Sequence, residues 1–341
     1  MPASAAAEIL GRAAEAQGTD ARVTERIASV QDLLADDLRW IESALAGAVD
    51  EGETPATLAA RHLVTRGGKR VRPMALMLSA ACFGRVTPRS DSWRWSLSWS
   101  IPRRCFTMTS WDEGMERRGV QTSRLAWGNA ISVLGGDLLL VHALQRTQQH
   151  APEIMPDLIS TLRRLVDGEI VQLRGRSELD VSEATYDRIL RDKTASLFAW
   201  STRTGARLAG ASLDDQERLA GFGERLGIAF QLVDDVLDYS GESTGKTLLT
   251  DLREGKLTLP LVLAVARMPE LVQPLRRIYA GDGEAVTLVS RAVVESGACE
   301  EVRRRASDHT RSAVEALRSV QPGPARVLLE SVAQQLAARA A

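Results

Sequence analysis

A row of acidic residues inside an apolar segment is the feature that most constrains the fold of this chain. Gln231, Asp234, Asp235 and Asp238 are spaced i, i+3, i+4 and i+7, so in a helix they form one polar stripe. Apolar residues cover the other faces between positions 226 and 237, which predicts a helix that is buried nearly all round. Buried carboxylates need a compensating cation, because desolvation and mutual repulsion both disfavour the charged form.

A hard divalent ion such as Mg²⁺ is the cation that best fits this acidic row. Such ions prefer oxygen ligands, and Mg²⁺ is commonly held by one or two carboxylates together with substrate phosphates. The alternative is a solvated acidic surface paired with Arg or Lys. A solvated face would have polar flanks, whereas the flanks here are apolar. The pattern therefore favours an internal site for a metal-bound phosphate.

Helical periodicity dominates the chain from about residue 23, and no alternating strand pattern of useful length accompanies it. The 341 residues include 44% hydrophobic but only 4% aromatic residues, which predicts a core of Leu, Val and Ala. We expect an all-α fold, with one helical domain over residues 21–341 after a flexible leader at 1–20. The predicted helices span residues 73–82, 127–147, 154–173, 183–209, 216–239, 259–266, 270–279, 284–295, 300–320 and 325–338.

The charge balance and the cysteines argue against several classes of protein. Lys+Arg 43 against Asp+Glu 44 give a net charge of -1, so no global field attracts nucleic acid or anionic lipid. Cys82, Cys105 and Cys299 are widely spaced and form no metal-ligand pattern, which indicates a reducing cytoplasm. Residues 1–20 contain no apolar run long enough for a signal peptide or a membrane span. We expect a cytoplasmic protein that binds no nucleic acid and does not insert stably into a membrane.

Several short basic motifs complement the acidic row. Residues 67–73 read GGKRVRP, with two glycines before three cations. Glycine lets backbone amides approach a ligand closely, and clustered Lys and Arg suit a diphosphate. Taken singly, such charges are more often solvated surface groups, but together they predict a site for two pyrophosphate groups bridged by metal. The other cations lie in Arg117-Arg118-Gly119 and beside Thr194 at Lys193, and at Lys246, Arg253 and Lys256.

These motifs resemble those of the trans (E-type) polyprenyl diphosphate synthases. Residues 231–238, QLVDDVLD, are similar to the family's second aspartate-rich motif, and residues 251–260, DLREGKLTLP, to the segment that follows it. The match covers nearly all of the chain after the first twenty or so residues. The resemblance implies an all-α helical bundle around a central cavity, usually a homodimer. It also implies Mg²⁺-dependent head-to-tail condensation of isopentenyl diphosphate with an allylic diphosphate.

By position, the resemblance assigns roles to individual residues of this chain. Lys69 and Arg72 would bind isopentenyl diphosphate, with help from Arg118. Residues that would bind the allylic diphosphate are Arg117, Lys193, Thr194, Gln231, Lys246 and Lys256. Asp234, Asp235, Asp238 and Asp112 would bind metal, and the catalytic residues would be Asp234, Asp235 and Lys193.

The family's first aspartate-rich motif, DDxxD, is disrupted. Its five positions, 108–112, read MTSWD, so only Asp112 keeps a carboxylate. The helical periodicity also stops between about residues 85 and 111, where four of the chain's seven tryptophans occur. Residues 103–111, RRCFTMTSW, can be encoded so that the neighbouring reading frame spells ATLLHDDVV directly before Asp112. We therefore hypothesise a compensated frameshift across residues 85–111, which resequencing of the gene tests.

The disruption bears on activity and on product length. In the family, carboxylates on two facing helices bind the metal, and this chain lacks two of them. We therefore expect the chain as it stands to be nearly inactive and a chain with the restored motif to be active. In the family, bulky side chains four or five residues before this motif stop growth of the product. The restored residues there are Ala and Thr, which predicts a long polyprenyl product.

Two alternatives remain. A non-catalytic partner subunit of a prenyl synthase, in a heterodimer, would keep the fold and lose catalytic residues, but the abrupt return of the pattern at Asp112 argues against gradual decay. A terpene synthase-like enzyme could work from one acidic motif, but it would not need Lys69 and Arg72 for isopentenyl diphosphate. The condensing enzyme is therefore the favoured interpretation.

Overall fold

The computed structural model describes residues 53–65, 71–84, 116–117, 120–121, 123–239 and 249–338 of the chain. The predicted leader at 1–20 and the disrupted segment at 85–111 lie outside these ranges.

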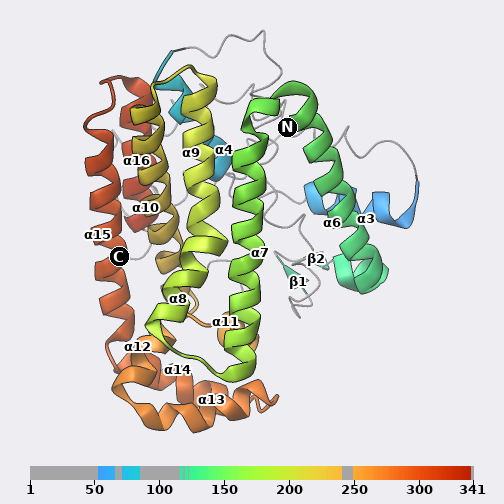
Figure 1. The fold of residues 1–341 in the computed structure, drawn as a ribbon. Helices are drawn as coiled ribbons and strands as arrows, with labels where there is room; N and C mark the ends of the chain where they lie inside the picture. Colours follow the sequence, from blue (N-terminus) through green and yellow to red (C-terminus); the bar gives the residue numbers. More distant parts are fainter. Residues whose placement is uncertain are drawn as a thin grey trace. The chain divides into compact units, whose positions relative to one another are not determined.

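The described residues are almost entirely helical, which confirms the predicted all-α fold (Figure 1). The strands found among them are β1, Glu116–Arg117, and β2, Val120–Gln121, which pair antiparallel. Ten described helical stretches match the predicted ones, although their ends differ by a few residues, while α3 and α11 were not predicted. The α-helices are α3 (Pro55–Thr65), α4 (Val71–Ala81), α6 (Ser123–His150), α7 (Met155–Glu178), α8 (Glu183–Ile189), α9 (Ser196–Leu208), α10 (Leu213–Leu237), α11 (Thr250–Arg253), α12 (Leu259–Arg267), α13 (Val272–Tyr279), α14 (Ala285–Glu295), α15 (Ala298–Leu317) and α16 (Pro324–Ala338).

Short helical turns of other types connect some of these helices. Two are 3₁₀ turns, η2 (Pro152–Ile154) and η4 (Pro269–Leu271), and each begins with the proline that the first helical position tolerates. The third, η3 (Leu190–Ala195), is a π-helical turn between α8 and α9. The predicted helix at 183–209 is therefore helical throughout, but it carries one wider turn in its middle. Such turns are rare and occur frequently at functional sites.

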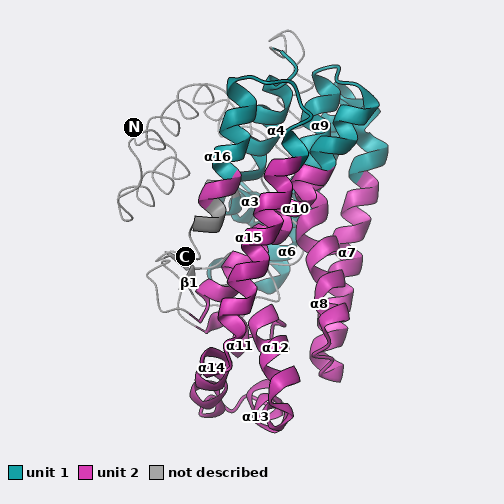
Figure 2. Cartoon of the chain, turned by 90° about the vertical axis from the view of Figure 1, so that its left-hand side faces the viewer, with its two compact units in different colours: residues 1–158, 200–220, 316–332 teal, residues 159–199, 221–315, 333–341 magenta. Residues whose placement is uncertain are grey.

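The chain divides into two compact units, which Figure 2 colours separately. Unit 1 comprises residues 1–158, 200–220 and 316–332. Within it α3 packs against α6, where a Cβ at Gly135 would lie 3.0 Å from Ala59 Cβ. The prediction of one domain over residues 21–341 stays a prediction.

Unit 2 comprises residues 159–199, 221–315 and 333–341. Its core contains mainly Leu, Val, Ala and Ile side chains from α10, α12, α13, α14 and α15, as the composition predicted. Helix α12 contacts both α8 and α14, and α14 in turn packs against α13 (Figure 1). This core surrounds the acidic end of α10.

Helix α6 is the one described helix that is long and apolar enough to cross a membrane by length and composition. The segment is Leu125–His150, with a hydropathy of 1.2. Core helices of soluble proteins meet the same criteria, so the finding is weak evidence for a span. The expectation that the protein does not insert stably into a membrane stays a prediction.

Candidate functional site

The acidic row lies at the carboxyl end of α10, within unit 2. Leu232, Val233 and Val236 are buried on the apolar faces of this segment, which confirms the predicted burial. Asp235 and Asp238 are buried as well, whereas Gln231 and Asp234 are half-buried. The four polar side chains therefore differ in environment although they share one stripe.

Asp235 is surrounded by hydrogen-bond donors of the protein. Its Oδ1 accepts from Gln231 Nε2 at 2.8 Å, and its Oδ2 accepts from the Tyr186 hydroxyl at 2.7 Å and from the Leu259 amide at 3.0 Å. Leu259 is the first residue of α12, so this carboxylate binds a backbone amide at that helix's amino end. Burial raises the pKa of Asp235 to about 7, although the three hydrogen bonds oppose that rise.

Asp238 performs a similar task for the short helix α11. Its Oδ1 accepts from the Thr250 amide at 3.1 Å and its Oδ2 from the Asp251 amide at 3.2 Å. Leu249, which precedes the helix, has a positive φ of 59°, a left-handed conformation that costs energy for a side chain with a Cβ. The amide of Leu249 also donates to the carbonyl of Asp238 at 3.1 Å. These bonds compensate for the strained backbone and attach α11 to the acidic end of α10.

Lys193 extends from the π-helical turn η3 toward α7. Its ammonium group forms an ion pair with Glu169 and donates to Gln172 Oε1 at 3.0 Å. Lys193 and Glu169 are both largely buried, with side-chain exposures of 15% and 13%. Gly168 permits this approach, because a Cβ there would lie 2.9 Å from the Lys193 amide nitrogen.

Thr194 connects the π-helical turn to the acidic row. Its buried hydroxyl donates to Gln231 Oε1 at 3.2 Å, and the amide group of Gln231 donates in turn to Asp235. A continuous path of hydrogen bonds thus runs from Thr194 through Gln231 and Asp235 to Tyr186. The structure therefore brings together three of the residues that the sequence placed in one site.

Lys256 follows α11 and contacts acidic side chains as well. It pairs with Asp251 at 3.2 Å and with Glu254 at a shorter distance. The Lys256 amide also donates to the Asp251 carbonyl at 2.8 Å. Lys193 and Lys256 therefore both form ion pairs with carboxylates.

The remaining predicted site residues are less completely described. Arg72 lies in α4 of unit 1, and its side chain is buried. The backbone of Arg117 forms part of β1, but its side chain lies outside the described residues. Four further predicted residues also lie outside them, namely Lys69, Asp112, Arg118 and Lys246.

The donor chemistry of the acidic row suits a hard divalent cation. Among the described residues, no group of three or more His, Cys, Asp and Glu side chains is arranged to hold a metal ion. Mg²⁺ does not require such a group, because one or two carboxylates and a substrate diphosphate commonly suffice. Asp234 is the half-buried carboxylate of the row, whereas the oxygens of Asp235 and Asp238 accept hydrogen bonds from the protein. The assignment of all three as metal ligands stays a prediction.

Three residues of this network were not predicted from the sequence. Tyr186 lies seven positions before Lys193 on the same predicted helix, and that spacing of about two turns was a usable signal. Glu169 and Gln172 are spaced i, i+3 on an otherwise amphipathic helix, which also indicates a shared face. Neither signal identifies a partner across the fold.

Comparisons with known proteins identify the family of the chain. Residues 54–296 match the family model described as Polyprenyl synthetase. The chain is 31% identical over 310 residues to octaprenyl diphosphate synthase of Escherichia coli (strain K12), which covers 89% of this chain and 96% of that protein. It is 34% identical over 250 residues to heptaprenyl diphosphate synthase component 2 of Geobacillus stearothermophilus, which covers 71% of this chain and 76% of that protein.

A solved structure shows the same fold. The polyprenyl synthase from Caulobacter crescentus CB15, complexed with calcium and isoprenyl diphosphate, superimposes with a TM-score of 0.83 and 30% identity. The alignment covers 92% of this chain and 97% of that chain. The family model spans most of the present chain, and the octaprenyl relative spans more of it still. The chain belongs to the polyprenyl synthetase family.

Proposed function

We propose that this chain is a prenyltransferase that condenses isopentenyl diphosphate head-to-tail with an allylic diphosphate. The observation that carries the proposal is the path from Thr194 through Gln231 to Asp235, beside Lys193 on the π-helical turn. The Thr194 hydroxyl and the Gln231 amide lie at the buried acidic end of α10, and Lys193 is the residue before Thr194. That combination suits a diphosphate bound together with a metal ion.

The allylic diphosphate is the substrate for this part of unit 2. Lys193 and Lys256 would bind its oxygens, with Thr194 and Gln231 as neutral hydrogen-bonding groups. Arg117 and Lys246 complete the proposed set. Isopentenyl diphosphate would be bound by Lys69, Arg72 and Arg118.

Asp234 is the residue that we assign first to Mg²⁺, with Asp235, Asp238 and Asp112 as the other acids of the site. A bound Mg²⁺ would neutralise the leaving diphosphate and so favour its departure. The relative from Caulobacter crescentus supports this assignment, because its structure holds calcium, another hard divalent cation, with isoprenyl diphosphate. Asp235 and Asp238 would mainly hold α12 and α11 in place around the site.

The cations of the site would assist cleavage of the allylic carbon–oxygen bond. As that bond breaks, negative charge grows on the leaving diphosphate, and Lys193 and Lys256 would stabilise that charge. The double bond of isopentenyl diphosphate supplies the electrons of the new carbon–carbon bond. A proton is then lost from the condensed product, which restores a double bond. The small residues of the restored sequence support a long polyprenyl product, as does the octaprenyl relative.

A turnover assay with isopentenyl and farnesyl diphosphates tests the proposal on two versions of the chain. The chain as it stands should be nearly inactive, because loss of one preorganised electrostatic group commonly costs about 3 to 4 kcal/mol and here two carboxylates are missing. The chain with DDVVD at positions 108–112 should form polyprenyl diphosphates. Equal rates would contradict the role given to the first motif, and no product from either version would contradict the proposed activity.

A non-catalytic partner subunit is the second candidate. The observation in its favour is the disrupted first motif, together with the similarity to a relative described as component 2. In that case the chain as it stands would raise the rate of a competent synthase when the two are mixed. The control is the same mixing assay with the chain carrying Asp234→Asn. If the rate increase depends on Asp234, the chain contributes to a shared site, and if it does not, contact between the two proteins is sufficient.

Association into a dimer is also part of the proposal. Helix α7 carries an exposed apolar stripe within unit 2, formed by Ile159, Val166 and Ile170 at exposures of 55%, 48% and 55%. Burial of this stripe against a second chain would remove apolar area from water. Light scattering after size exclusion should give the mass of two chains, and Val166→Glu should shift the protein toward one chain.

A reducing cytoplasm is the compartment that suits the unpaired Cys82 and Cys299.

A further inference from the structure

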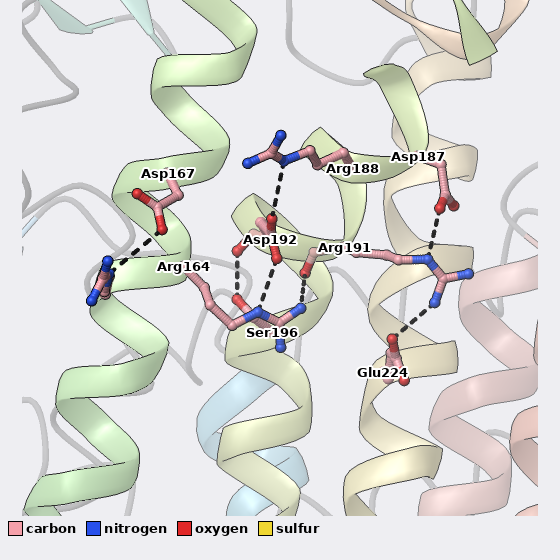
Figure 3. A network of polar contacts seen from close by, with 9 residues as sticks. Arg164, Asp167, Asp187, Arg188, Arg191, Asp192, Ser196 and Glu224 are labelled. Carbon is pink, nitrogen blue, oxygen red and sulfur yellow. Dashed lines mark hydrogen bonds and ion pairs between the residues drawn. The ribbon is translucent and has the colours of Figure 1, made fainter. Parts of the chain in front are cut away.

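A charged contact on the outer side of η3 has no part in the function proposed above. Arg164 on α7 donates from Nε to Asp192 Oδ1 at 2.9 Å, and from its terminal nitrogen to the Arg191 carbonyl at 3.5 Å (Figure 3). Both acceptors belong to the π-helical turn that carries Lys193. We infer that Arg164 is a positioning residue that holds this turn in the register that directs Lys193 into the site. The inference rests on the proposed function.

The π-helical turn is a conformation that needs support. It inserts an extra residue into the helix, so its hydrogen bonds run from i to i+5 and are less favourable than those of an α-helix. The Arg191 carbonyl accepts from the Ser196 amide in this manner and from Arg164 as well. The Asp192 carbonyl accepts from the Ser196 hydroxyl at 2.5 Å. Two carbonyls of the turn therefore receive side-chain hydrogen bonds that an ordinary helix would not require.

Helix α7 touches the same turn at its backbone. A Cβ at Gly168 would lie 3.1 Å from Asp192 Cβ and 3.2 Å from Lys193 Cβ. Gly168 is four residues after Arg164, so both residues lie on the face of α7 that meets the turn. A shift of Asp192 away from Arg164 would therefore move the adjoining Lys193 relative to its partner Glu169.

Further ion pairs lie on the outer side of the turn. Arg188 lies 4.0 Å from Asp192 Oδ2, and Arg191 pairs with Asp187 at 2.8 Å and with Glu224 at 2.9 Å (Figure 3). The Arg164 and Asp192 side chains are 46% and 21% exposed, so their pairing adds little to global stability. Its loss should change the local position of Lys193 while the protein stays folded. Because the local change is separate from unfolding, the positioning role of Arg164 can be tested.

The matched control is the arginine immediately before it on α7. Arg163 forms an ion pair with Asp167 at 3.9 Å and is 84% exposed, and Asp167 lies on α7 and not in the turn. Arg163→Met removes the same charge from the same helix as Arg164→Met. Arg164→Lys keeps the charge but loses the fork that reaches both Asp192 and the Arg191 carbonyl.

Chemical labelling of lysines reads the position of Lys193 without any ligand. An amine-reactive ester followed by peptide mass spectrometry should modify Lys193 several times faster in Arg164→Met than in Arg163→Met or the unsubstituted chain. Lys256 serves as the internal control, and its rate should not change. The labelling rate of Lys193 in Arg164→Lys should lie between the rate in Arg164→Met and the rate in the unsubstituted chain. Equal labelling of Lys193 in both methionine variants would overturn the inference.

Calorimetry then connects the position of Lys193 to substrate binding. Farnesyl diphosphate with Mg²⁺ should bind roughly tenfold more weakly to Arg164→Met than to Arg163→Met, in a chain that carries the restored first motif. Isopentenyl diphosphate should bind both equally, and Arg164→Met should cause no further loss in a Lys193→Met background. If both single variants bind farnesyl diphosphate equally well, the inference fails. If the unsubstituted chain with the restored motif binds none, the proposed function fails instead, and the labelling experiment still decides whether Arg164 positions the turn.

Discussion

Replacement of Asp235 by asparagine should change how stability depends on pH. Asp235 has a pKa of about 7 in the folded protein against an ordinary value of 3.8, chiefly because it is buried. A carboxyl whose pKa is raised by folding stabilises the protein below the unfolded pKa. That contribution is lost as the pH rises through the folded pKa. The wild-type protein should therefore lose stability between about pH 4 and pH 7 on account of this one group.

The size of the effect follows from the shift. A difference of about three pKa units corresponds to about 4 kcal/mol at most, since one unit is worth about 1.4 kcal/mol. Somewhat more than half of it, about 2.5 kcal/mol, falls between pH 5 and pH 8. Asn has nearly the same shape and does not titrate. Asp235→Asn should consequently gain about 2.5 kcal/mol relative to the wild type on going from pH 5 to pH 8.

Urea unfolding of both proteins at the two pH values measures this difference. Magnesium must be absent, because a bound cation would hold the acidic row in its ionised form. Asp214→Asn, at the exposed start of the same helix, controls for the loss of one formal negative charge. If the stability difference between Asp235→Asn and wild type is the same at both pH values, burial does not govern this carboxyl and the reasoning is wrong.

Three further substitutions test the packing of the helices and the cap of α8. Gly205→Ala should destabilise the protein by about 3 kcal/mol or more, because its Cβ would overlap the Leu76 carbonyl oxygen. A thermal unfolding scan should show the loss. Ser182→Ala should lower the free energy of unfolding in urea by about 1 kcal/mol, because Ser182 caps α8 by accepting from the Thr185 amide. Ser177 caps no helix start, so an equal loss in Ser177→Ala would contradict that cause. Phe222→Ala should lower the free energy of unfolding by about 3 to 5 kcal/mol in chemical denaturation, because this side chain is fully buried. A loss under about 1 kcal/mol would show that the core collapses around the cavity.

The sequence predicted the helices well where burial dictates a long periodic pattern. Helix α10 is the clearest case, because its apolar faces and acidic stripe both persist over several turns. Helix α11 contains four residues, too few to show any period, and it depends on Asp238 for two hydrogen bonds at its start. The π-helical turn was likewise unpredictable, because it changes hydrogen bonding without changing the apolar pattern.

The sequence placed several residues in one candidate site, but it did not predict the hydrogen bonds that join them in the structure. Lys193, Thr194 and Gln231 could be placed in one site by motif, and the structure joins Thr194 to Gln231. The bond from Tyr186 to Asp235 spans 49 positions of sequence, and that from the Leu259 amide spans 24. Contacts of that separation depend on how helices pack, which local periodicity does not encode. For that reason the sequence suggested three equivalent acids, whereas two of them accept backbone amides of neighbouring helices.

Magnesium-dependent uptake of an allylic diphosphate is the most direct test of the account. Calorimetry of farnesyl diphosphate with the chain carrying the restored first motif should show binding that requires Mg²⁺. Asp234→Asn should weaken that binding at least tenfold, which corresponds to about 1.4 kcal/mol. Tight binding that persists in a chelator and is indifferent to Asp234→Asn would contradict the claim that the buried acidic row of α10 is a site for metal-bound diphosphate.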